Sequence, residues 1–178
     1  MKKFLLFLMT SVALVSCSSD DDSGKITKRC EFSTTYSNFY DNQNIAYIAN
    51  QGRLTQSAGE NTVFEIKTVP PACPIKTISG REIEKENKTY RILFQVPNGN
   101  NQFNWSGENL VANDSPILEI SDENNRVIGV YFMNEPSNFI RATKKGNKWN
   151  VSYSLEYKSA NFSYKLENTN QVFTQSKH

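Results

Sequence analysis

The sequence contains a single histidine, His178, which is the last of its 178 residues. Catalytic Ser-His-Asp and Cys-His sites, and metal sites with imidazole ligands, need a histidine held in place, whereas a chain end is prone to fray. The eight glycines stand singly along the chain and form no glycine-rich phosphate loop. The sequence therefore argues against histidine-based catalysis and gives no support for nucleotide binding.

The chain also lacks a large excess of charge of one sign. Lys and Arg number 20 and Asp and Glu number 18, a formal net charge of +2. Two of the cations, Lys2 and Lys3, stand near the N-terminus, and without residues 1–16 the chain has 18 cations and 18 acids. Proteins that bind nucleic acid present a basic face to its phosphates, so we expect no nucleic acid partner.

The apolar run at residues 4–15 is too short to cross a membrane, because a spanning helix needs about 20 residues. Two lysines precede this run, and a polar stretch at residues 18–24 follows it. A positive segment, a short apolar core and a small residue are the layout of a secretory signal peptide. We therefore expect residues 1–16 to be removed from the mature protein.

A second motif ends this leader: Leu14, Val15, Ser16 and Cys17. It resembles the signal of bacterial lipoproteins, in which a leucine, a variable residue and a small residue precede an acylated cysteine. The resemblance implies that the mature protein begins at Cys17 and that acyl chains on this residue hold it at a membrane. The alternative is an ordinary secretory signal in which Cys17 has no such role.

The residues after Cys17 bear on the location of the protein. The stretch Ser-Ser-Asp-Asp-Asp at residues 18–22 resembles the export signal of Bacteroidota lipoproteins. This resemblance implies an outer-membrane anchor with the domain on the cell surface, and the alternative location is the periplasmic face. The acidic run is also explained by a solvated spacer, and in either case residues 17–28 form a flexible tether.

Two further cysteines, Cys30 and Cys73, remain in the mature chain. Beyond the inner membrane thiols tend to be oxidised, so we expect a disulfide between them. It would close a loop of 43 residues, the separation of positions 30 and 73, and contribute about 4 kcal/mol in the chain-entropy model. The alternative is two buried free thiols. Two cysteines without a nearby histidine do not make a zinc site, and we expect no metal and no cofactor.

Alternating apolar and polar residues indicate strands at residues 88–96, 149–157 and 162–167. Residues 127–133 are apolar at nearly every position, which predicts a central strand covered on both faces. Strands and turns recur at intervals of about 8–15 residues. This spacing predicts one all-β domain over residues 29–170, followed by a C-terminal tail at residues 171–178. The expected fold is an antiparallel β-sandwich, immunoglobulin-like or jelly-roll in outline, with a small β-barrel as the alternative.

Aromatic residues among polar neighbours are the candidates for ligand binding. Tyr36 and Tyr40 stand among Ser, Asn and Asp, and Trp105 follows Gln, Phe and Asn. Placed in exposed loops, these rings would stack on the flat faces of sugars while the amides bind hydroxyl groups. The alternative is that they are core residues, as most aromatic residues are.

The sequence thus predicts a non-enzymatic binding or accessory module of the cell envelope, anchored by lipid, with an unidentified glycan as its ligand. One alternative is a protein-interaction component of an outer-membrane complex. A second is a carboxylate-based hydrolase, which needs two carboxyl groups across a cleft. Candidates for such a pair are Glu119, Asp122 and Glu123, and also Glu82, Glu84 and Glu86.

Overall fold

The computed structural model describes residues 33–70, 88–112 and 115–177, and nearly all of its regular elements are strands, so the predicted all-β class is confirmed. The strands are β1 (Thr34–Ile48), β2 (Arg53–Ala58), β3 (Asn61–Val69), β4 (Thr89–Pro97), β5 (Gln102–Ser106), β6 (Ile117–Ser121), β7 (Val127–Phe132), β8 (Phe139–Lys145), β9 (Lys148–Lys158) and β10 (Ser163–Gln175). A 3-10 turn, η1 (Ala49–Gln51), follows β1, and a short helix, α1 (Glu108–Ala112), follows β5. In this part of the chain no helix has the length and apolar character needed to cross a membrane.

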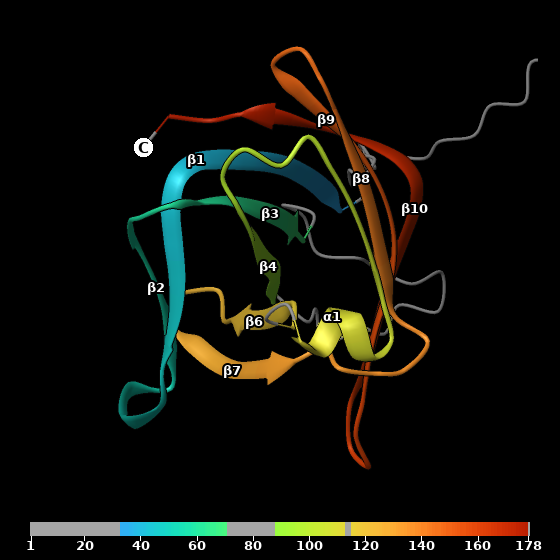
Figure 1. The fold of residues 1–178 in the computed structure, drawn as a ribbon. Helices are drawn as coiled ribbons and strands as arrows, with labels where there is room; N and C mark the ends of the chain where they lie inside the picture. Colours follow the sequence, from blue (N-terminus) through green and yellow to red (C-terminus); the bar gives the residue numbers. More distant parts are fainter. Residues whose placement is uncertain (1–32, 71–87, 113–114, 178) are drawn as a thin grey trace, which may run out of the picture.

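The strands form one ten-stranded open sheet in the order β5-β8-β9-β10-β1-β3-β4-β6-β7, with β2 paired to β1 outside this path. Every pairing is antiparallel except that between β1 and β10, which is parallel. Figure 1 shows β8, β9 and β10 on one side of the molecule and β6 and β7 on another, with β1 and β3 between them. The sheet bends around its interior, which gives the sandwich-like arrangement expected from the sequence.

The main hydrophobic core lies on the inward face of this bent sheet. Phe64 of β3 stacks on Phe94 of β4 with ring centroids 4.9 Å apart. The rings of Trp149 and Phe173 meet Phe64 edge-on at 5.2 Å and 5.6 Å, which brings β9 and β10 against β3. The alternate residues of β9 are buried as the sequence pattern predicted: Trp149, Val151, Tyr153 and Leu155.

Strand β1 turns a corner near its middle (Figure 1). Its register with β3 shifts between Tyr40 and Gln43, and Asn42 has a φ of 59°, a left-handed conformation that asparagine tolerates. Beyond this corner β1 pairs with β2, and the two lie against the outward face of β3, β4 and β6. A smaller core fills the space between these layers: Tyr40, Leu54, Val63, Leu93 and Ile117.

The predicted central strand at residues 127–133 is wrong. β7 lies at the end of the strand order, and Ile128 and Phe132 are 53% and 45% exposed. A short apolar run does not distinguish a strand covered on both faces from an edge strand with apolar residues in solvent.

The predicted domain end at residue 170 is also too early, because β10 continues to Gln175 and Phe173 is fully buried. The register of β10 with β9 shifts between Asn168 and Gln171. The inward residues therefore have even numbers before the shift, such as Leu166, and odd numbers after it, such as Phe173. Because the alternation is interrupted, the sequence pattern does not show that the strand continues to Gln175.

Candidate functional site

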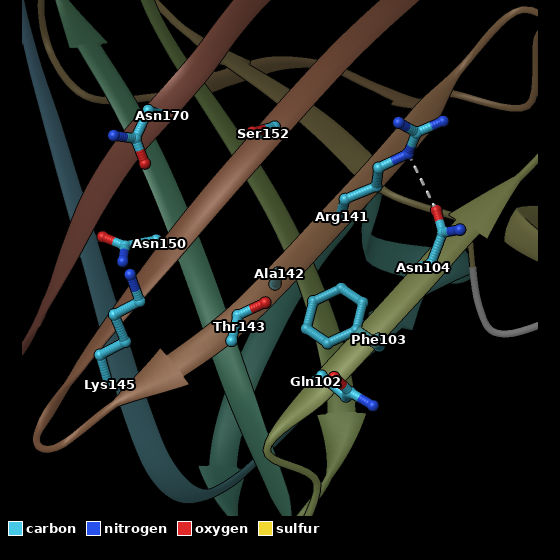
Figure 2. A pocket seen from close by; sticks show the side chains of 10 residues that line it. All are labelled: Gln102, Phe103, Asn104, Arg141, Ala142, Thr143, Lys145, Asn150, Ser152 and Asn170. Atoms are coloured by element: carbon cyan, nitrogen blue, oxygen red, sulfur yellow. Dashed lines mark hydrogen bonds between the residues drawn. The ribbon is translucent and has the colours of Figure 1, made fainter.

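A polar groove lies on the outward face of β5, β8 and β9 (Figure 2), and we call it the polar groove below. Its volume is about 640 Å³, which is within the range of small-molecule binding sites. Amide, hydroxyl and cationic side chains make up most of its lining. Such a lining suits a ligand rich in polar groups rather than an apolar one.

The register of the strands explains why these side chains meet. Residues paired on adjacent strands point to the same face of a sheet, and the outward positions of β5, β8 and β9 are polar. Across these strands, Thr143 lies beside Gln102 and Asn150, and Arg141 lies beside Asn104 and Ser152.

The inward positions of the same strands hold the groove in place. Ile140 and Val151 alternate with the groove residues and are buried in the main core. The backbone beneath the groove is thus fixed by packing, which limits the entropy lost when a ligand binds.

A bulge in β10 forms a further part of the lining. Between Asn168 and Gln171 this strand has one residue more than β9 opposite it. The hydroxyl of Ser152 on β9 donates a hydrogen bond to the carbonyl of Thr169, and the backbone N–H of Asn170 donates to Asn168 Oδ1 at 3.0 Å. These bonds hold the bulge in the position from which Asn170 lines the groove.

The charged side chains that line the polar groove are all positive. Arg141 and Lys145 line it, and no Asp or Glu is among its lining residues. Arg141 Nε donates to Asn104 Oδ1 at 3.1 Å, which Figure 2 shows as a dashed line, and the guanidinium carbon lies 5.2 Å from the ring centroid of Phe139. These two contacts fix the guanidinium of Arg141, because one uses its Nε–H and the other its planar face.

A second hollow of about 600 Å³ adjoins the polar groove along the same strands, and Phe139, Ser154, Glu167 and Asn168 are among its lining residues. Phe139 and Ser154 are each two positions from a groove residue on β8 and β9, a step of about 7 Å along a strand. The two hollows together extend along the face of β8, β9 and β10.

The structure does not bring the predicted aromatic residues together. Tyr36 and Tyr40 lie in β1 and Trp105 in β5, so their expected placement in loops is wrong. The strand order puts β8, β9 and β10 between these two strands. The polar neighbours of Trp105, Asn104 and Ser106, are exposed residues of β5, whereas Ser37 beside Tyr36 is a buried residue of β1. Polar residues at both kinds of strand position look like loop residues in the sequence.

The three rings also differ in exposure. Tyr36 is 51% exposed, whereas Tyr40 is buried and its hydroxyl donates to Glu65 Oε2 at 2.8 Å. Trp105 is half-buried against the main core, with its ring centroid 4.6 Å from that of Phe103. Tyr36 is therefore the candidate of the three whose ring is open to a ligand.

The cysteines Cys17, Cys30 and Cys73 lie outside the described residues, so the lipid attachment and the disulfide stay predictions. The ladder between β1 and β3 ends with Thr34 opposite Val69. Cys30 and Cys73 each stand four positions beyond these paired ends in the sequence.

Of the carboxylates considered for hydrolysis, Glu119 is held by a cation and Asp122 holds a turn. Glu65 and Glu119, which are buried on the outward face of β3 and β6, both accept hydrogen bonds from Arg91. Burial acts to raise the pKa of Glu65, but attraction to Arg91 and hydrogen bonds from Arg91 and Tyr40 outweigh it, and the net pKa is lowered. A general acid needs a raised pKa, so Glu65 is shifted in the opposite direction.

Asp122 holds a turn. Its carboxylate accepts bonds from the backbone N–H groups of Asn124 and Arg126, and the hydrogen bond from the Arg126 backbone is the main cause of its lowered pKa. Glu82, Glu84 and Glu86 lie outside the described residues. Within the part of the chain that the structure describes, no three His, Cys, Asp or Glu side chains gather to hold a metal ion.

The fold and the polar groove define an all-β domain with a candidate binding face. No protein-family model, no curated protein and no solved structure matches the chain.

Proposed function

We propose that this protein is a lipid-anchored module of the cell envelope that binds a glycan in the polar groove. The observation that carries the proposal is the grid of amide and hydroxyl groups across three neighbouring strands. In place of the aromatic residues chosen from the sequence, the proposed binding residues are mainly polar: Gln102, Asn104, Thr143, Asn150, Ser152 and Asn170.

The chemistry of these groups matches that of a sugar. Each sugar hydroxyl both donates and accepts a hydrogen bond, and the side chains of Asn and Gln also do both. The groove residues stand on strands whose inward faces are packed, so several hydrogen bonds form without ordering a loop. The adjoining hollow at Phe139 gives room for a ligand of more than one sugar unit.

The predicted anchor supports a role in the envelope. A tether of residues 17–28 would reach at most about 40 Å when fully extended, so the domain would remain near the membrane surface. One acyl chain gives only marginal binding, and stable anchoring needs a second chain or another membrane contact. The lipoprotein resemblance implies more than one chain on Cys17.

Binding of soluble polysaccharides to the full-length protein in detergent tests the proposal, with calorimetry as the readout. Asn104 and Asn150 stand on different strands of the groove, and Asn161 is an exposed asparagine in the turn between β9 and β10. Replacing both groove residues with Ala should weaken binding by about thirtyfold, because each of the two lost hydrogen bonds contributes about 1 kcal/mol. Asn161→Ala should leave the affinity unchanged. Failure of every neutral and acidic polysaccharide to bind would refute the proposal.

A second candidate function, protein docking, is favoured by an apolar patch on another part of the surface. Tyr47 and Phe132 are partly exposed and meet edge-on at 5.6 Å, and Val111 is 49% exposed. These residues border a hollow of about 310 Å³. Recovery of one defined envelope protein with the wild type but not with Phe132→Ser would favour docking, and equal recovery with both would count against it.

A further inference from the structure

We infer that the polar groove selects acidic saccharides, with an anionic group of the sugar held at Arg141. This inference rests on the proposed function and adds the class of glycan. Without residues 1–16 the chain has equal numbers of cations and acids, yet the groove is lined by Arg141 and Lys145 and by no acid. The local excess of positive charge is therefore a property of the polar groove and not of the whole protein. The acid of the adjoining hollow, Glu167, is paired with Lys165 at 2.8 Å.

Arg141 is arranged to bind an anion. Its Nε–H is bonded to Asn104, and Phe139 lies against the guanidinium. Among the described residues, the two terminal nitrogens of Arg141 have no hydrogen-bond partner. These nitrogens form the forked edge that binds a carboxylate or a sulfate through two hydrogen bonds.

The far end of the groove is also positive. Lys145 lies directly opposite Lys148 at the turn between β8 and β9, and no acid lies between them in the ladder. Like charges in directly opposed positions destabilise a sheet, so this pair is not explained by the stability of the hairpin. An anionic ligand would remove the repulsion.

The spacing of the cations favours an extended ligand. Arg141 and Lys145 are four residues apart on one strand, so their Cα atoms are about 13 Å apart. Two anionic groups on a chain of sugars fit this distance better than one small anion does. Nucleic acid fits less well, because single strands bind through exposed aromatic rings, and the aromatic residue lining the groove, Phe103, packs against Phe64 and Trp149 of the core.

Matched probes test the inference on the full-length protein in detergent. Polygalacturonate is compared with its methyl ester, which has the same backbone without charge, and dextran sulfate with dextran. We expect the charged member of at least one pair to bind roughly tenfold more tightly at low salt, and the preference to fall as salt rises. The pair that shows the preference identifies the anionic group as carboxylate or sulfate.

Variants show whether the preference arises in the groove. Arg141→Gln and Lys145→Gln should each reduce the preference by roughly threefold to tenfold, with Arg141→Lys between wild type and Arg141→Gln. Arg53→Gln and Lys177→Gln remove the same charge from exposed residues elsewhere and should leave the preference unchanged. Circular dichroism confirms that each variant is folded.

The outcomes separate the two proposals. Equal binding of charged and neutral probes that is still lost in the Asn104 and Asn150 double variant would overturn the acidic selectivity and leave glycan binding standing. Binding of no saccharide would overturn both. Tighter binding of a single-stranded oligonucleotide than of any polysaccharide would overturn the assignment to sugars.

Discussion

The buried ion cluster between the two layers gives the sharpest prediction about stability. Arg91 on β4 binds both Glu65 and Glu119, and the two carboxylate side chains are only 10% and 9% exposed. Arg91→Met would leave two buried acids without their cation. Breaking a buried ion pair in this way costs 3–5 kcal/mol, and since the Arg91 side chain is 24% exposed we expect the lower end, about 3 kcal/mol at neutral pH.

The loss should depend on pH. In the wild type the pKa of Glu65 is lowered, so its contribution to stability is present above the pKa of the unfolded carboxyl and is lost as pH falls through the lower folded pKa. Without Arg91, burial remains as the main influence and raises the pKa of Glu65. Acidification to about pH 4 should then protonate the buried carboxyl and narrow the difference between variant and wild type.

Urea unfolding followed by tryptophan fluorescence measures this difference, because Trp149 is fully buried. A loss of about 3 kcal/mol corresponds to a melting temperature lower by about 6–12 °C. Arg53→Met, at an exposed arginine of β2, should change stability by less than about 0.5 kcal/mol. An Arg91→Met loss as small as that of the control, or one that grows on acidification, would refute the reasoning.

Three further predictions concern the C-terminus and the cysteines. Phe173→Ala should destabilise the domain by about 3–4 kcal/mol in urea unfolding, because its ring is fully buried. A loss of less than about 1 kcal/mol would indicate that the residues after 170 form a tail that does not pack on the domain. Cys17→Ala should abolish incorporation of a labelled fatty acid, and equal labelling of the variant would exclude lipidation at this residue. Cys30 and Cys73 should resist alkylation until a reductant is added, and reduction should lower the melting temperature; two freely alkylated thiols in the unreduced, denatured protein would exclude the bridge.

Much of the fold could be predicted because strand alternation is a local property. Trp149, Val151, Tyr153 and Leu155 alternate with polar residues, and β9 is found where that pattern lies. The pattern of apolar residues misleads at β7. Its apolar run suggested a strand covered on both faces, but β7 is an edge strand and some of its apolar residues are exposed to solvent. The pattern also misleads after Asn168, where the bulge shifts the alternation by one position.

The candidate site could not be predicted from alternation alone. Asn104 and Arg141 are 37 positions apart in the sequence and meet only because β5 pairs with β8. The sequence does show that the outward positions of β8 and β9 are polar. Polar residues are expected on any solvent-exposed face of a sheet, so they do not by themselves indicate a binding site. The local excess of cations becomes visible only when strand order and register are known.

The buried cluster has a similar cause. Glu65, Arg91 and Glu119 come from three strands and are joined across the sheet by register. In the sequence each is a charged residue with an apolar or aromatic residue on either side. Pairing of buried charges is a property of neighbours, so no pattern within a single strand predicts it.

The parallel pairing of β1 with β10 determines when the domain can finish folding. Asn38 lies beside Thr174, the backbone N–H of Ser176 donates to the carbonyl of Phe39, and Gln175 reaches Asp41 across 134 positions of the sequence. When the chain emerges with its N-terminus first, β1 can pair with β3 early. The other edge of β1 has no partner until β10 has emerged. Contacts between such distant segments form slowly. The step that completes the sheet therefore comes after nearly the whole polypeptide has left the machinery that makes or exports it, and until then the edge of β1 is open to other chains.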